Sequence, residues 1–311
     1  MKKQLIYFAA GLGMLVISTA LLLFLPTFSV LYIPLMLALF SSLFMCEGKW
    51  HGILIALIGF LSLTFLSQSV AISAMCVLLP FVLSAVSASV IKKAPSEKTL
   101  TLVYGLANAL FLAGIIFITK EETGGMSGLL AQITDTFNQN LDMFTSQGLI
   151  DSTDKETYIS QLSLVLDQLK RMIPAILFVF SAIMGYISLW LSWLVSRLLK
   201  APVCFKPSFS RFKCNTVTTG MTILICLLSI FIKDGVLGVA LDNAFAIFSF
   251  LLCTCTASLA DYWLKQKNWA TIVRIIIVLF LLSNYYGSIL SLLMCMIAIF
   301  DARADLRKLE H

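Results

Sequence analysis

The sequence is poor in charged residues and in histidine. Of its 311 residues, 12% are charged and 59% are hydrophobic, and the two histidines, His51 and His311, stand in no ligand-spaced cluster. A zinc or iron site is therefore not expected. The motifs G-x-x-x-x-G-K-[ST], H-E-x-x-H and G-x-S-x-G are also missing, which argues against a P-loop ATPase and against the common hydrolases. We expect a protein that is not an enzyme and that holds no metal or cofactor.

Cysteine spacing excludes a second group of functions. The eight cysteines form no C-x-x-C pair, and the long polar segment 120–172 has none. This pattern predicts neither a disulfide framework nor a thiol redox motif. The cysteines are expected to pack among apolar side chains.

Long apolar runs define the fold class. A soluble domain with a mean hydropathy of +0.96 could not bury this much apolar surface, and runs of about 18 or more apolar residues, long enough to cross a bilayer, recur along the chain. We predict an all-α integral membrane protein, a helical bundle of about ten transmembrane helices (roughly eight to ten). Their expected ranges are 4–25, 28–46, 51–67, 70–91, 100–119, 173–199, 217–232, 236–260, 269–284 and 286–300.

The distribution of Lys and Arg predicts the orientation. If the N-terminus is cytoplasmic and the spans alternate, all but five of the 22 Lys and Arg residues fall on the cytoplasmic side, as the positive-inside rule requires. The predicted location is the bacterial cytoplasmic membrane, with both termini cytoplasmic. The formal charge of +6 is explained in this way, so the lipid bilayer, and not nucleic acid, is the expected partner.

The stretch SNYYG, residues 283–287, is the only polar interruption between 270 and 300. Asn and Gly favour turns, and paired tyrosines suit the headgroup region. A single crossing would place the basic C-terminus outside, against the charge rule. We therefore predict an outer turn between two crossings.

The segment 120–172 keeps a helical apolar period although it is polar and acidic. Thr153 and Glu156 form a capping-box pattern at the start of its second helix. We predict an extracytoplasmic amphipathic helical hairpin with helices near 128–146 and 153–171. The expected domains are thus 1–119, 120–172 and 173–311, the last with a basic cytoplasmic loop at 200–217.

That basic loop mixes proline, phenylalanine and cations. One interpretation is an interfacial loop anchored by aromatic rings and anionic lipid. The other is a docking surface for a partner. The candidate docking residues are Phe205, Phe209, Arg211 and Phe212.

A few polar residues are expected at membrane depth. Asp242 is the most notable, because a central Asp costs roughly 2.5–3.5 kcal/mol on insertion scales and is usually paired. It can make a structural hydrogen bond between helices or contact a ligand. The candidate ligand-binding residues are Asp242, Asn243, Asn108, Tyr186, Asn284, Tyr285 and Tyr286.

Two stretches resemble known families. Residues 33–63 are similar to the second and third helices of energy-coupling-factor (ECF) transporter substrate-binding subunits, and Ala9 and Gly13 give a small-xxx-small surface suited to close docking. The order after residue 120, with MIPAILFVFSAIMGYISLWLSWLVSRLL and a terminal FDARADLRKL, resembles the YybS-like family of bacterial membrane proteins (domain of unknown function 2232).

These resemblances imply a small-molecule binding or transport component that relies on a separate ATPase or membrane coupling module. The alternative function is a scaffold that recruits envelope-assembly or signalling partners. A ligand held among the spans near 100–119, 173–199 and 236–260 would favour the first. A filled core with an exposed hairpin face would favour the second.

Overall fold

The protein is described by a computed structural model. It describes residues 8–9, 11–13, 15–17, 19, 31–45, 49–91, 97–123, 125–147, 152–199, 206–285 and 288–307. The side chains of 49, 91, 97–98, 115–123, 125–127, 129, 133 and 152–156 are not part of this description.

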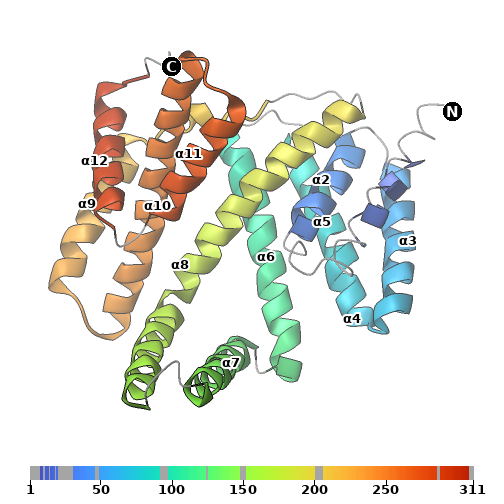
Figure 1. Cartoon of the computed structure of the whole chain (residues 1–311). Coiled ribbons are helices and arrows are strands. Elements are labelled where there is room, and N and C mark those ends of the chain that lie inside the picture. The colour runs from blue at the N-terminus through green and yellow to red at the C-terminus, as the bar shows by residue number, and fades with distance from the viewer. Residues whose placement is uncertain are drawn as a thin grey trace. The chain divides into compact units, whose positions relative to one another are not determined.

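The described residues form helices and connecting turns, with no strand among them (Figure 1). In chain order these are α2 (Tyr32–Met45), α3 (Lys49–Ser67), α4 (Val70–Ser73), the π-helical turn η2 (Ala74–Leu78), α5 (Leu79–Ile91), α6 (Glu97–Thr123), α7 (Gly125–Ser146), α8 (Ser152–Leu198), the 3₁₀ turn η3 (Phe209–Arg211), α9 (Thr216–Phe231), α10 (Gly235–Gln266), α11 (Thr271–Ser283) and α12 (Ile289–Ala304).

The prediction of an all-helical, strongly apolar chain is confirmed. Four described helical stretches, within 50–67, 70–90, 157–198 and 235–266, are long and apolar enough to cross a membrane. Shorter apolar helices lie at 32–45, 99–114, 216–231 and 271–283. Of the predicted first span, only the residues 8–9, 11–13, 15–17 and 19 are described, and they are helical.

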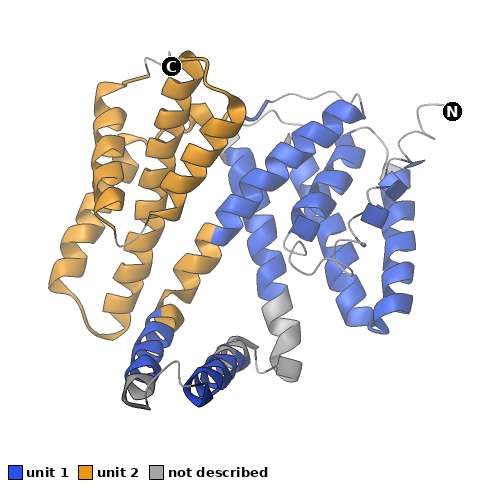
Figure 2. Ribbon diagram, viewed as in Figure 1, with its two compact units in different colours: residues 1–168, 180–207 blue, residues 169–179, 208–311 orange. Residues whose placement is uncertain are grey.

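The chain divides into two compact units (Figure 2). Unit 1 comprises residues 1–168 and 180–207, and unit 2 comprises residues 169–179 and 208–311. The second half of α8 therefore belongs with the N-terminal helices, whereas the sequence had placed it in a C-terminal region beginning at 173. α8 also runs without a break through 172, where the sequence analysis separated the outer segment from a membrane span.

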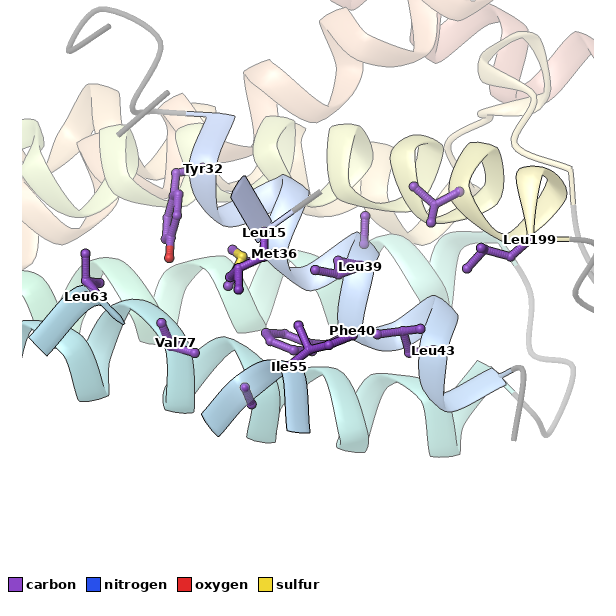
Figure 3. Packing of buried hydrophobic residues seen from close by; sticks show 13 residues of the cluster. Leu15, Tyr32, Met36, Leu39, Phe40, Leu43, Ile55, Leu63, Val77 and Leu199 are labelled. Atoms are coloured by element: carbon purple, nitrogen blue, oxygen red, sulfur yellow. The ribbon is translucent and has the colours of Figure 1, made fainter. Parts of the chain in front are cut away.

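α2 lies at the centre of unit 1. It is apolar all round, which is the pattern of a helix surrounded by protein, and it packs against α5, α3 and α6. Met36, Phe40 and Leu43 point into a cluster that also includes Ile55 of α3 and Val77 of η2 (Figure 3). These side chains are essentially inaccessible.

Tyr32 of α2 compensates for a proline in the neighbouring helix. Pro80 has no N–H to offer the carbonyl of Cys76, four residues earlier. The Tyr32 hydroxyl donates to this carbonyl instead, at 3.1 Å. The buried Tyr32 thus satisfies a backbone group that the π-helical turn and Pro80 leave open.

Hydroxyl groups join α2, α6 and α8 inside unit 1. The Tyr104 hydroxyl lies 2.8 Å from Ser41 Oγ and 2.8 Å from Ser192 Oγ, and these two serine oxygens are themselves 2.8 Å apart. Ser196 Oγ donates to Ser42 Oγ at 3.0 Å. All five side chains are buried, so this network clamps the helices at a depth where water cannot substitute.

Small residues let α6 and α8 approach closely. A Cβ on Gly185 would lie 2.5 Å from Gly105 N and 2.6 Å from Gly105 Cα, which is backbone against backbone. A Cβ on Gly105 would meet Ser181 O at 3.5 Å and Ala182 Cα at 3.8 Å, which are ordinary contacts. Ser181, Gly185, Ser188, Ser192 and Ser196 form one stripe of α8, and it is this stripe that faces α2 and α6.

We therefore expect Gly185→Ala to lower the thermal stability of the detergent-solubilised protein, because the new methyl group forces two helix backbones apart at a cost of about 1–3 kcal/mol. Gly105→Ala, at the same crossing, should change the melting temperature far less. Equal melting temperatures for the two variants would contradict the close approach.

Unit 2 is built along one long helix. α10 has 32 residues, which is about 48 Å. α9 has 16 residues and runs beside the N-terminal half of α10: Cys214 Sγ, at its start, donates to Leu251 O, and its end turns tightly onto Gly238. α11 and α12 pack beside the C-terminal half (Figure 1).

The SNYYG turn separates two helices, as predicted, but its position differs from the prediction. The Tyr285 ring meets Phe250 edge to face at 5.4 Å, and Cys253 Sγ donates to the carbonyls of Tyr285 and Ser291. The turn therefore lies beside the middle of α10 and not at its end. The physical reason is length: α11 has 13 residues and α12 has 16, and a full crossing needs about 20.

If α10 crosses the bilayer, this turn lies near mid-depth and should be shielded from both aqueous phases. In a background without native cysteines, we expect Asn284→Cys to react slowly with a membrane-impermeant maleimide, in intact and in permeabilised cells. Val236→Cys, which is 90% exposed at the start of α10, should react in intact cells, and Ala304→Cys only after permeabilisation. Rapid labelling of Asn284→Cys in intact cells would instead support the prediction that SNYYG is an outer turn.

The segment predicted as an outer hairpin is helical where it is described. α7 covers the first predicted helix, and α8 begins at Ser152, next to the predicted cap. Leu130 and Leu141 of α7 are buried, as the apolar period predicts. The side chains of Thr153 and Glu156 lie outside the described residues, so the capping box stays a prediction.

Candidate functional site

An open groove lies at the N-terminal end of α10. Its volume is about 460 Å³ and its lining consists of Arg171, Lys233, Asp234, Gly235, Val236 and Val239. The size falls within the range of roughly 300–1,000 Å³ typical of small-molecule sites. Two cations, one carboxylate and two valines give it a mixed polar and apolar wall.

The tight α9–α10 turn shapes this groove. Gly235 has φ +74°, a conformation that suits glycine. A Cβ on Gly238 would lie 2.5 Å from the carbonyl oxygen of Lys233. Glycine at both positions therefore lets the chain reverse directly, which brings Lys233 beside the first turn of α10.

Asn243 closes a gap in α8 next to this groove. Pro174 cannot donate to the carbonyl of Lys170 and disturbs the helix there. A side chain bridges the next backbone N–H and carbonyl of the helix. Asn243 Oδ1 accepts from Ala175 N at 2.9 Å, and Asn243 Nδ2 donates to the carbonyl of Arg171 at 2.7 Å. Asn243 thus joins α10 to α8 at the weakest point of α8 and fixes the backbone of a groove residue.

Asp242 does not turn inward, contrary to the sequence analysis. Its side chain is exposed, and it has no hydrogen-bond or ion-pair partner among the described residues. Its neighbour Asn243 is buried instead, 7% exposed, and makes the helix–helix contact. The carboxylate takes the solvent-accessible face of α10, because only the amide can both donate and accept at the Pro174 gap.

Three helix ends meet beside the middle of α10. α11 ends at Ser283, where Asn284 Nδ2 donates to Phe280 O at 2.9 Å. α12 begins at a cap in which Ser288 Oγ accepts from Ser291 N, and α9 begins at a cap in which Asn215 Oδ1 accepts from Thr218 N. We call this region the helix-break layer, comprising the described residues 214–216, 249–256, 284–285 and 288–291.

The remaining candidate ligand residues are placed separately. Asn108 is buried in unit 1 and donates to Tyr104 O at 2.7 Å and to Ser188 Oγ at 3.2 Å, which is a helix–helix role. Tyr186, also in unit 1, is half-buried. Asn284 and Tyr285 belong to the helix-break layer in unit 2, and Tyr286 lies outside the described residues. Whether any of them binds a ligand stays a prediction.

The candidate docking residues also differ in placement. Phe209 is half-buried and packs against the apolar cluster around Cys253, and its carbonyl accepts from Ser258 Oγ at 2.6 Å. Arg211 is exposed and Phe212 is half-buried. Phe205 lies outside the described residues.

Of the other two docking candidates, Ala9 and Gly13 are both exposed. A Cβ on Gly13 would meet no atom of the described residues within 4 Å. Gly11, between them, is the residue that packs closely, against Ile55.

A buried arginine, which the sequence analysis did not single out, holds the basic loop. Arg307 Nε and Nη2 contact Asp301 Oδ2 at 3.1 and 3.0 Å. Nη1 donates to Ser210 O and Ser258 Oγ, both at 2.8 Å, and Nη2 donates to Cys255 O at 2.8 Å. These four hydrogen bonds and the ion pair tie the loop, α10 and the C-terminal segment together.

Sequence signals existed for some of these features. A proline inside the apolar run MIPAILFVF marks a gap that a neighbour must fill, and the spacing of Ser181, Gly185, Ser188, Ser192 and Ser196 marks a small-residue stripe. No local signal pairs Arg307 with Ser210 or Ser258, since these contacts are far apart in the chain. Among the described residues, no group of three or more His, Cys, Asp or Glu is arranged to hold a metal ion.

We expect Asn243→Ala to destabilise the protein by about 1–3 kcal/mol, because it leaves a buried N–H and carbonyl unpaired. The loss of stability should be smaller in a Pro174→Ala background, where α8 can form its backbone hydrogen bonds without interruption. The measurement is a double-mutant cycle on thermal unfolding in detergent. Additive effects of the two substitutions would show that Asn243 does not serve the proline gap.

The long apolar helices are those of an integral membrane protein of the polytopic α-helical class. A family of predicted membrane proteins (DUF2232) matches residues 13–302 of the chain. The chain belongs to this family, which confirms the YybS-like resemblance. No curated protein and no solved structure matches it.

Proposed function

We propose that the protein is a membrane-embedded component that binds a small molecule and takes part in its movement across the bilayer. The observation that supports this most is the helix-break layer in unit 2. Non-helical backbone at membrane depth is tolerated only where protein buries it or where it lines a cavity. In secondary transporters, interrupted helices of this kind carry the substrate site near the midplane.

The depth of this layer follows from the side chains along α10. Asp242 near one end is exposed, and so is Trp263 near the other. An exposed carboxylate is costly within hydrocarbon, and tryptophan prefers the interface. The residues 243–262 between them number about 20, the length that crosses roughly 30 Å. Phe250 and Cys253, which contact the SNYYG turn, lie at the middle of this stretch.

The groove at the other end of unit 2 supports an entry route. It opens beside Asp242, on the side of α10 assigned to the exterior by the charge rule. Its wall combines Arg171 and Lys233 with Val236 and Val239, so a small molecule with polar and apolar parts would be retained there. Asn243 holds the backbone carbonyl of one lining residue, Arg171, against α10.

The proposed topology keeps both termini on the cytoplasmic face of a bacterial cytoplasmic membrane. α11 and α12 form a re-entrant hairpin that enters and leaves at the C-terminal end of α10, and α9 covers only the other half. The sequence count of about ten crossings therefore includes partial ones. The basic C-terminal segment is cytoplasmic whether α11 and α12 cross the bilayer fully or form a re-entrant hairpin.

The ECF resemblance adds a partner to this proposal. No P-loop motif occurs in the chain, so energy from ATP would have to come from a separate subunit. The exposed faces of Ala9 and Gly13 offer a close-packing surface for such a membrane module.

The test is ligand retention by the full-length protein. The purified protein in detergent is incubated with the polar metabolite extract of the host cell, washed, and analysed for bound small molecules by mass spectrometry. We expect at least one compound to be enriched over an unrelated membrane protein. Its retention should fall at least tenfold in Arg171→Glu/Lys233→Glu and in Asn284→Leu. Lys265→Gln, at the opposite end of α10, should keep it.

A folded protein that enriches no compound would contradict the proposal. So would enrichment that survives both site variants. Size-exclusion profiles and melting temperatures establish that each variant is folded before its retention is compared.

The scaffold function is favoured by a separate observation. The outer part of α8 exposes an apolar stripe that includes Tyr158, Val165 and Leu169, as a partner-binding helix would. Photo-crosslinking from position 165 in intact cells tests this alternative. A specific protein adduct, together with no retained small molecule, would favour the scaffold.

A further inference from the structure

The cytoplasmic end of unit 2, as assigned above, carries more positive charge than its own acids neutralise. Among the described residues, the acidic side chains at this end are Asp261, Asp301 and Asp305, and each one is in an ion pair. The pairs are Arg274–Asp261 at 2.6 Å, Arg307–Asp301 at 3.0 Å and Lys213–Asp305 at 2.6 Å. Arg274–Asp261 and Lys213–Asp305 connect different segments, and Arg307–Asp301 joins the turn after α12 to α12 itself. None of the three lies at the N-terminal end of α10.

Five exposed cations are left over at this end: Lys206, Arg211, Lys265, Lys267 and Arg303. None has an ion-pair partner in the described part of the chain. They come from the loop before α9, the end of α10 and the end of α12. The antiparallel order of α10 and α11, and the parallel order of α10 and α12, bring these segments to one end of unit 2 (Figure 1).

Two tryptophans accompany these cations. Trp263 is 45% exposed and Trp269 is 47% exposed. The corner that holds them is well defined: Trp269 N donates to Leu264 O and Asn268 N donates to Lys265 O, which with Asn268 at φ 56° is a Schellman motif. An exposed indole beside a cation is the arrangement that favours the headgroup layer of a bilayer.

The loop that contributes Lys206 and Arg211 is held in place. Arg307 binds the carbonyl of Ser210 and Lys213 binds Asp305. The cations therefore project from a fixed frame rather than from a free tail, which lowers the entropic cost of binding a charged surface.

We propose that this basic end of unit 2 binds the headgroups of anionic phospholipids in the leaflet that it faces. The positive charge of this end of unit 2 and its inferred depth in the bilayer both favour lipid as the ligand. Trp263 and the cations lie where α10, counted from Asp242, has just crossed the hydrocarbon, so they are level with phosphate groups. Basic residues in this position attract anionic lipid through the surface potential of the membrane.

The test compares thermal unfolding of the full-length protein in neutral-detergent micelles doped with phosphatidylglycerol or phosphatidylcholine. We expect phosphatidylglycerol to raise the melting temperature and phosphatidylcholine to have no such effect. The increase should be lost in Arg211→Gln/Lys265→Gln/Lys267→Gln. It should persist in the charge-conserving variant Arg211→Lys/Lys265→Arg/Lys267→Arg, and it should fall as salt is added.

Lipid co-purified from native membranes is the second readout. The ratio of anionic to neutral lipid should be at least threefold lower for the glutamine variant. Lys206→Gln/Arg303→Gln supplies an independent pair should the triple variant fold poorly. An equal melting-temperature increase in the wild-type and glutamine proteins overturns the proposal. So does a full response to glycerol phosphate alone, which would assign the site to a free phosphate compound.

Discussion

In this protein, most of the structure follows from one constraint: backbone and side-chain polar groups within apolar helices must find partners inside the protein. Two prolines make the constraint visible. Pro80 cannot donate to the carbonyl of Cys76, and the hydroxyl of Tyr32 donates to it instead. Beside Pro174, the amide of Asn243 binds a backbone N–H and a backbone carbonyl of α8. Each gap is filled by a side chain whose donors and acceptors match it. Because the partners are protein groups and not water, these contacts also determine which helices are neighbours.

The two units satisfy their buried polar groups in different ways, and the proposed function rests on this difference. In unit 1, hydroxyls of Tyr104, Ser41 and Ser192 satisfy one another around a tightly packed α2. These hydroxyls are therefore committed to one another and to the packing of the helices. In unit 2, helices end beside the middle of α10 and a groove opens near its start. Interruption of helices costs stability, so a structural role alone gives little reason to retain it.

The fold class and the helix positions were predictable from sequence, whereas the depth of the helices was not. Apolar runs and Lys/Arg bias locate segments and turns, and both SNYYG and the helices near 128–146 were found in this way. Hydropathy does not say where one helix lies along another. That register comes from contacts such as Phe250 with Tyr285, which are distant in sequence. Likewise, the sequence did not single out Arg307, because Ser210 and Ser258, which its guanidinium contacts, lie far away along the chain.

Asp242 shows how the meaning of a residue changes once its surroundings are known. In the sequence, it is an acid inside an apolar run, so insertion cost argues for a buried, paired carboxylate. In the structure, Asn243 fills the buried position and Asp242 is exposed. The same insertion cost then argues that the hydrocarbon ends near residue 242, and it leaves about 20 residues of α10 to cross the bilayer. Helices of 13 and 16 residues beside that stretch reach only part of the way across. Asp242, which looked out of place in the sequence, is therefore the residue from which the depth of unit 2 is inferred.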